Sequence, residues 1–171
     1  MALIGIFFGS DTGNTETIAK IIQQQLGCDV AEVHDIAKSS KEDVEAFDIL
    51  LFGIPTWYYG EAQCDWDDFF PTLEHIDFNK KSVALFGCGD QEDYAEYFCD
   101  AIGMLHDIIE PRGAIIIGNW STKGYSFEAS KGLADNKHFI GLAIDEDRQP
   151  ELTSERVRTW VKQISEELNL K

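Results

Sequence analysis

The stretch LIGIFFGSDTGNT, residues 3–15, decides the fold of this chain. Residues 3–8 form an apolar run typical of a buried strand, and the hydroxyl-rich turn Ser10-Asp11-Thr12-Gly13-Asn14-Thr15 follows it. An amphipathic helical pattern begins directly after that turn. A junction of this kind points backbone N–H groups and a helix N-terminus at one spot, which favours an anion. The stretch therefore predicts an anion site, and the simpler alternative is a turn that only caps a helix.

The turn contains no Lys or Arg, and the first basic side chain after it is Lys20. Turns that bind nucleoside triphosphates usually follow the pattern G-x-x-x-x-G-K-[ST], in which the Lys reaches the terminal phosphates. Because that Lys is missing here, the turn favours a single terminal phosphate held by neutral donors.

Apolar runs and amphipathic patterns alternate along the rest of the chain. Such alternation indicates a parallel sheet covered by helices on both faces, so we expect one doubly wound α/β domain over residues 1–171. Residues 119–138 show no period, and we expect them to be an insertion that splits the last strand, with 114–118 before it and 139–143 after it. The predicted strands are Leu3–Phe8, Val30–Val33, Ile49–Ile54, Val83–Phe86, Ala114–Gly118 and Phe139–Ile144.

The composition narrows the choice of partners and compartment. The net charge of −17 argues against nucleic acid and anionic membranes and favours a basic protein partner. No apolar run approaches the ~18 residues of a membrane span, and the chain shows no basic leader. The four Cys and the four His show no metal-ligand spacing. We therefore expect a cytoplasmic protein with free thiols and no metal site.

Two acidic stretches, residues 56–78 and 90–110, contain no Lys or Arg. Acidic runs are often no more than solvated faces, but these two surround aromatic residues, which favours a docking surface. In the second stretch we expect a helix in which Asp93, Glu96 and Asp100 share one exposed face. The opposite face is the apolar stripe of Ala95, Phe98, Ile102 and Leu105.

Three loops that follow predicted strands are chemically unusual: residues 10–15, 54–61 and 87–94. Ligands of open α/β sheets bind beyond the carboxyl ends of the strands, so these loops should meet at one edge. Trp57 in the second loop and Tyr94 in the third could bracket a flat ring, although either alone could be a packing residue. None of the three loops contains a cationic side chain. Together they predict a ligand with one phosphate and a planar heterocycle.

The motifs Ser10–Thr15, Pro55-Thr56-Trp57-Tyr58-Tyr59-Gly60 and Gly87-Cys88-Gly89-Asp90-Gln91 resemble those of the flavodoxin family. The resemblance covers the whole chain, and the insertion at 119–138 resembles the long-chain bacterial branch. It implies a five-stranded sheet of order 2-1-3-4-5 and an electron carrier that binds FMN non-covalently. It also implies that the Tyr58–Tyr59 peptide faces the flavin.

By the same resemblance, the turn at 10–15 holds the FMN phosphate, and Trp57 and Tyr94 sandwich the flavin ring. Asp11 should point to solvent, because a carboxylate repels a phosphate. Asp147 should lie near the ribityl chain. The full set of cofactor-binding residues that we predict is Ser10, Asp11, Thr12, Gly13, Asn14, Thr15, Pro55, Thr56, Trp57, Tyr58, Tyr59, Gly60, Cys88, Gly89, Asp90, Tyr94, Tyr97, Cys99 and Asp147.

The resemblance implies a low-potential one-electron carrier and not an enzyme. Its expected partners are ferredoxin(flavodoxin)–NADP reductase, or a similar basic reductase, and electron-acceptor enzymes, and we expect a monomer. The alternative is an FMN-dependent NAD(P)H quinone or nitro reductase on the same fold. A phospho-receiver domain is excluded, because it needs an Asp after the third strand, where this chain has Gly53-Ile54-Pro55.

Overall fold

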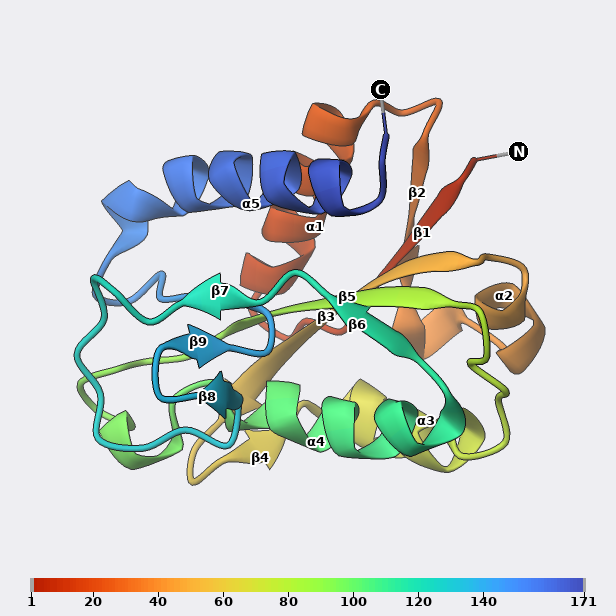
Figure 1. Ribbon diagram of the computed structural model, residues 1–171. Helices are drawn as coiled ribbons and strands as arrows, with labels where there is room; N and C mark the ends of the chain where they lie inside the picture. Colours follow the sequence, from red (N-terminus) through yellow and green to blue (C-terminus); the bar gives the residue numbers. More distant parts are fainter. Residues whose placement is uncertain (1, 171) are drawn as a thin grey trace.

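A computed structural model describes residues 2–170 and shows a central parallel sheet between two layers of helices (Figure 1). The strand order is β10-β5-β3-β1-β2, which is the predicted order 2-1-3-4-5 when the central strands are counted along the chain. The short β4 (Glu61–Ala62) pairs antiparallel with the end of β3. The central strands are β1 (Ile4–Phe8), β2 (Ala31–Asp35), β3 (Ile49–Trp57), β5 (Ser82–Cys88) and β10 (Leu142–Ile144).

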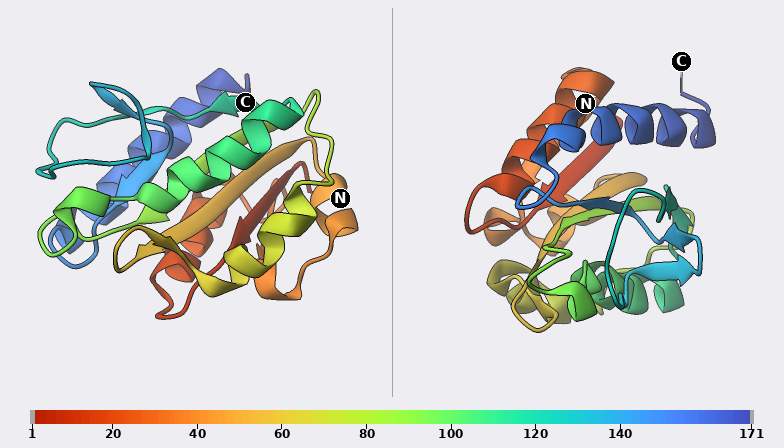
Figure 2. Two further views of the ribbon diagram at one scale, coloured as in Figure 1. Left: turned by 90° about the horizontal axis from the view of Figure 1, so that it is seen from below. Right: turned by 90° about the vertical axis from the view of Figure 1, so that its left-hand side faces the viewer.

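The helices divide between the two faces of the sheet (Figures 1 and 2). Helices α1 (Asn14–Leu26) and α5 (Thr153–Glu167) cover one face. Helices α2 (Lys41–Glu45), α3 (Cys64–Leu73) and α4 (Asp100–Ile109) cover the other. Successive β1 side chains alternate between the two layers: Ile6 and Phe8 pack with the α1 side and Phe7 with the α3 side. Burial on both faces is the reason why these strands are apolar without alternation.

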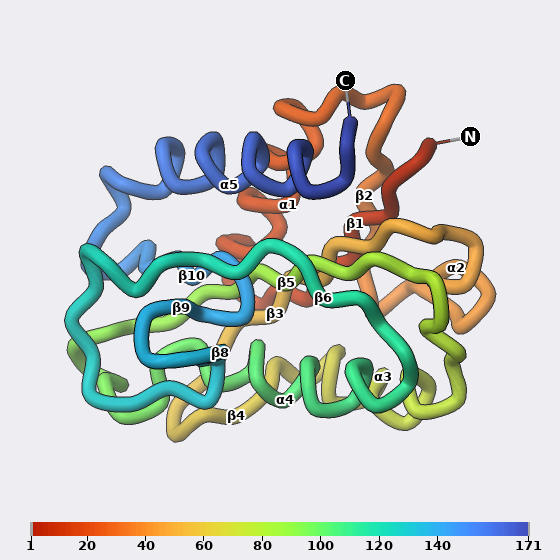
Figure 3. The backbone as a smooth tube through the Cα atoms, in the orientation of Figure 1, coloured from red at the N-terminus to blue at the C-terminus, as the bar shows by residue number. Residues whose placement is uncertain are grey.

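The last strand of the sheet is split, as predicted. The strand β6 (Ile115–Ile117) pairs with the first half of β5, and β10 pairs with the second half. Between them the chain forms a small antiparallel sheet of order β7-β9-β8, which lies beside the main sheet (Figure 3). Its strands are β7 (Trp120–Ser121), β8 (Leu133–Asp135) and β9 (His138–Phe139). Phe139 therefore belongs to the insertion and not to the resumed strand; strands of two or three residues are too short to show a period.

The single helix expected from Ala95 onward is wrong. The segment Ala95–Tyr97 is a 3-10 turn, and α4 begins only after Cys99, whose φ of +54° breaks the helical path. Asp100 is 2% exposed, and its Oδ1 accepts a hydrogen bond from the Lys131 backbone N–H at 2.7 Å. The insertion thus covers the first turn of α4, and the predicted acidic face of Asp93, Glu96 and Asp100 does not exist. Asp93 and Glu96 alone remain exposed.

The remaining short helical segments are 3-10 turns: Ile36–Lys38, Glu110–Arg112 and Pro150–Leu152. Within residues 2–170 no helix has the length and apolar character needed to cross a bilayer.

Candidate functional site

The three loops predicted from the sequence open into one cavity of about 370 Å³ at the carboxyl ends of β1, β3 and β5. The loop after β10 also borders this cavity and contributes Glu146 and Asp147. The loops lie side by side because their strands are neighbours in the parallel sheet. The residues that line the cavity are Ser10, Thr12, Asn14, Thr15, Pro55, Thr56, Trp57, Tyr58, Cys88, Gly89, Asp90, Tyr94, Glu146 and Asp147.

The turn before α1 has the geometry of an anion site. Gly13 adopts a left-handed conformation with φ +91°, and no side chain within residues 2–170 caps the N-terminus of α1. The Ser10 hydroxyl oxygen accepts a hydrogen bond from the Gly13 N–H at 2.9 Å, which closes the turn. A Cβ at Gly13 would meet no atom within 4 Å, so the space before the helix is open. An uncapped helix N-terminus facing open space suits a phosphate.

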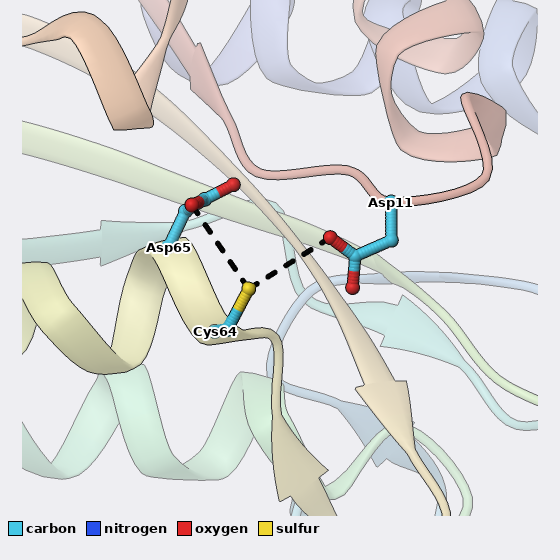
Figure 4. Close-up of side chains that lie close together, drawn as sticks. All are labelled: Asp11, Cys64 and Asp65. Atoms are coloured by element: carbon cyan, nitrogen blue, oxygen red, sulfur yellow. Dashed lines mark hydrogen bonds between the residues drawn. The ribbon is translucent and has the colours of Figure 1, made fainter.

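Asp11 lies outside the cavity lining. It is exposed, and its carboxylate accepts a hydrogen bond from the Gln63 amide at 3.0 Å. The same amide donates to Asp65 at 2.8 Å, so Gln63 bridges the two carboxylates. The thiol of Cys64 lies between them, 3.9 Å from Asp11 Oδ1 and 4.0 Å from Asp65 Oδ1 (Figure 4). Partial desolvation and the charges of both carboxylates raise the pKa of the Cys64 thiol.

The aromatic side of the cavity is formed by Trp57, Tyr58 and Tyr94. Tyr58 has φ +46° and Gly60 has φ +86°, so the turn after β3 is held in two left-handed steps. A Cβ at Gly60 would lie 2.7 Å from Asp100 Oδ2, which shows how closely α4 supports this turn. Tyr59 is 73% exposed and does not line the cavity.

Two of the predicted cofactor-binding residues, Tyr97 and Cys99, do not line the cavity but contact residues near it. The Tyr97 ring lies 5.8 Å from the Tyr59 ring and makes no part of the cavity wall. Cys99 is fully buried behind Gly89, and burial raises the pKa of its thiol well above the usual range. Burial also raises the pKa of the Cys88 thiol to about 12, and this thiol accepts a hydrogen bond from the Thr15 hydroxyl at 3.6 Å. Both thiols are neutral at physiological pH.

The loops after β5 and β10 are joined through Asp145 and Arg148, neither of which belongs to the predicted cofactor-binding set. Asp145 is fully buried, and its carboxylate accepts hydrogen bonds from the Gln91 backbone and side chain. Arg148 contacts Asp90, so a cation lies beside the cavity although none of the three predicted loops contains one. Burial, together with the charges of Asp90 and Asp145, raises the pKa of the Asp147 carboxyl.

The cavity thus includes most of the residues predicted to bind the cofactor. Those that it leaves out sit behind the wall or beside it. They are Asp11, Gly13, Tyr59, Gly60, Tyr97 and Cys99. The cofactor-binding role of each residue stays a prediction.

A doubly wound parallel sheet with an uncapped helix N-terminus and an aromatic wall at its carboxyl edge is typical of flavodoxin-like nucleotide-binding proteins. The family model described as flavodoxin matches residues 6–160. Flavodoxin 1 of Escherichia coli K12 is 82% identical over 170 residues, covering 99% of this chain and 97% of that protein. The flavodoxin of Haemophilus influenzae is 72% identical, covering 99% and 98%. The chain therefore belongs to the flavodoxin family.

A solved relative agrees with this assignment. The crystal structure of Fusobacterium nucleatum flavodoxin bound to flavin mononucleotide superposes with a TM-score of 0.91 at 38% identity, covering 98% of this chain and 99% of that chain. Flavodoxins are FMN-bound electron carriers. The chain is thus an electron-transfer protein and not an enzyme, and the predicted family, fold and function are confirmed.

Proposed function

We propose that the cavity at the carboxyl edge of the sheet holds FMN, with the phosphate at the turn before α1 and the ring at the aromatic wall. The observation that carries the proposal is that both chemistries open into one cavity of about 370 Å³. Neutral hydroxyl and amide donors line this cavity together with the aromatic rings of Trp57 and Tyr94. This arrangement matches a ligand that has one phosphate and one planar heterocycle.

The role of each residue in binding FMN follows from its position in the cavity wall. Thr12, Asn14 and the first N–H groups of α1 would bind the phosphate oxygens. Thr56 accepts a hydrogen bond from the Ala101 N–H at 2.9 Å, which leaves its hydroxyl proton free to donate to the ribityl chain, near Asp147. Gly89 and Asp90 would face the pyrimidine edge of the ring. The bound FMN supplies the redox chemistry, and the protein adjusts its potential.

The acidic surroundings make the carrier a low-potential donor. One carboxylate ~8 Å from the ring at an effective dielectric constant of ~20 opposes an added negative charge by about 2 kcal/mol. For a one-electron couple that is on the order of 90 mV, at roughly 59 mV per 1.4 kcal/mol. Asp90, Glu146 and Asp147 all line the cavity, so their charges act together on the bound cofactor.

The partner is a basic reductase of the ferredoxin(flavodoxin)–NADP reductase class, and the acceptors are enzymes that meet the same surface. Exposed Glu92, Asp93 and Glu96 line one surface pocket together with Tyr59. The ring centroid of Tyr59 lies 6.4 Å from that of Tyr94. Charge complementarity raises association rates and weakens with salt. The whole chain, residues 1–171, acts as a single-domain cytoplasmic monomer.

Reconstitution of the apoprotein tests the proposal. Added FMN should bind in a one-to-one complex with quenched flavin fluorescence, and NADPH should bleach the flavin only when the basic reductase is present. Increasing salt should slow that reduction. An apoprotein that binds FMN no better than a denatured sample overturns the proposed site. Bleaching by NADPH alone overturns the dependence on a reductase.

A further inference from the structure

One guanidinium gathers three carboxylates beside the proposed flavin site. Arg148 Nε lies 3.1 Å from Asp90 Oδ1, and Nη2 lies 3.3 Å from Asp90 Oδ2, which is a two-pronged contact. Arg148 Nη1 lies 3.1 Å from Glu92 Oε2, and Nη2 lies 2.9 Å from Asp93 Oδ2. All three guanidinium nitrogens are therefore engaged, and the planar fork of Arg suits this geometry.

The contact joins two loops that come from different strands. Asp90 follows β5 and Arg148 follows β10, so they are 58 residues apart in sequence. Asp90 Oδ1 also accepts the backbone N–H groups of Glu92 and Asp93, each at 3.0 Å. Arg148 in turn is fixed at its backbone N–H, which donates to the buried Asp145 at 2.9 Å. The side chain of Arg148 therefore bridges two backbone segments that are each already folded around a carboxylate.

The cluster also changes the charge at the cavity wall. The three carboxylates contribute −3 and the guanidinium +1, which leaves −2 at this point. Residues 88–94 and 145–149 contain no other Lys or Arg. Asp90 is 11% exposed at its side chain and lines the cavity, so the compensation acts directly at the wall. Isolated surface pairs contribute little, but several charges on one geometrically matched group form a network.

We propose that Arg148 is a positioning residue that clamps the loop 88–94, which contains Tyr94, onto the loop 145–149, and that its charge keeps the flavin potential less negative than the surrounding acids alone would set. This inference rests on the proposed binding of FMN in this cavity. Removing the charge would leave Asp90, Glu92 and Asp93 to repel one another and the reduced cofactor. Loop order and potential should therefore change together.

Two substitutions separate the clamp from the charge. Arg148→Gln removes both, whereas Arg148→Lys keeps the positive charge and loses the two-pronged contact with Asp90. Arg158→Gln is the matched control, because Arg158 is 71% exposed on α5, outside the cavity wall, and loses the same unit of charge. The measurements are amide hydrogen exchange at Glu92 and Asp93 in the apoprotein, the FMN dissociation constant, and the reduction potential of the second electron.

Arg148→Gln should speed exchange at both amides and raise the FMN dissociation constant about tenfold. Its second potential should become more negative by about 59 mV, which is a tenfold change in a one-electron equilibrium. Arg148→Lys should speed exchange but keep the potential near that of the parent, and Arg158→Gln should change neither. Equal potentials in the Lys and Gln variants overturn the charge role, and unchanged exchange in both overturns the clamp. Failure of the parent apoprotein to bind FMN would instead overturn the proposed site itself.

Discussion

Asp145 and Gln91 are joined by two hydrogen bonds, one from the Gln91 backbone N–H at 3.0 Å and one from its side-chain amide at 2.9 Å. The other carboxylate oxygen of Asp145 accepts the backbone N–H groups of Asp147 and Arg148 at 3.1 and 2.9 Å. A charge that is fully buried is tolerated only when its oxygens are paired in this way. The loops after β5 and β10 are therefore both held by the same buried carboxylate, that of Asp145.

Replacing the Asp145 carboxylate should lower the free energy of unfolding more than replacing any acidic residue on the surface. Asp145→Ala leaves four buried or partly buried donors without an acceptor, and we expect the free energy of unfolding of the apoprotein to fall by about 3–5 kcal/mol. Asp145→Asn keeps one oxygen for the Asp147 and Arg148 amides but faces Gln91 with an NH₂ group, so its loss should be smaller. Urea unfolding measures both, and equal losses in the two variants would contradict the assignment of the oxygens.

The phosphate turn makes a prediction that depends on the ligand. Thr12→Ala should weaken FMN binding by about 1.5–3 kcal/mol, the usual value of a hydrogen bond to a charged group. Riboflavin has no phosphate, so its affinity should not change. Fluorescence quenching titrations with both flavins measure the difference. A parallel loss for riboflavin would place Thr12 away from the phosphate.

The aromatic wall can be tested with two tyrosines that are close in space. Tyr94→Leu should raise the dissociation constants of FMN and riboflavin alike, because it removes a stacking contact worth roughly 0.5–1.5 kcal/mol beyond its buried area. Tyr59→Leu should leave both constants near those of the parent, since Tyr59 does not line the cavity. If instead Tyr59→Leu weakens flavin binding as much as Tyr94→Leu, the turn closes over the ring when the flavin binds.

Asp100 predicts a pH dependence of stability. Burial raises the pKa of its carboxyl above the usual 3.8, so the ionised form lowers stability at neutral pH. Asp100→Asn removes that charge and retains an acceptor for the Lys131 N–H. The Asn variant should melt at a higher temperature near pH 7. The gain should shrink as pH falls through the raised pKa and vanish below the ordinary 3.8, where the carboxyl is protonated in both the folded and the unfolded chain. Asp29→Asn, an exposed change, is the control and should show no such trend.

Local patterns were enough to predict the parallel strands and most of the cavity wall, whereas the order of the strands came from the family resemblance. The run at 3–8, the turn that follows it and the apolar stretch before Trp57 each express their structure within about ten residues. Strands buried on both faces are apolar throughout, and neighbouring parallel strands bring their loops together. The positions of Thr12, Trp57 and Tyr94 in one cavity follow from those facts.

Contacts between residues that are far apart in the sequence could not be predicted from local patterns. Asp100 has the spacing of an exposed helical acid, but the backbone at Lys131 covers it. Arg148 lies in a loop that periodicity does not connect to Asp90, 58 residues earlier. The strands β7 and β9 contain two residues each, so their pairing depends on contacts and not on a pattern. Each failure concerns a residue whose partner lies more than ten residues away.

The backbone N–H of Ser126 donates to Gln91 Oε1 at 2.7 Å, so the inserted segment is hydrogen-bonded to the same glutamine that Asp145 holds. Deleting the inserted segment, residues 119–138, would remove this hydrogen bond and destabilise the loop after β5 that forms part of the cavity. Any shortened version of this chain would need a new hydrogen-bond donor to the side-chain oxygen of Gln91 before it could keep the architecture of the cavity. Shortening the chain at this insertion should therefore also lower its affinity for the cofactor.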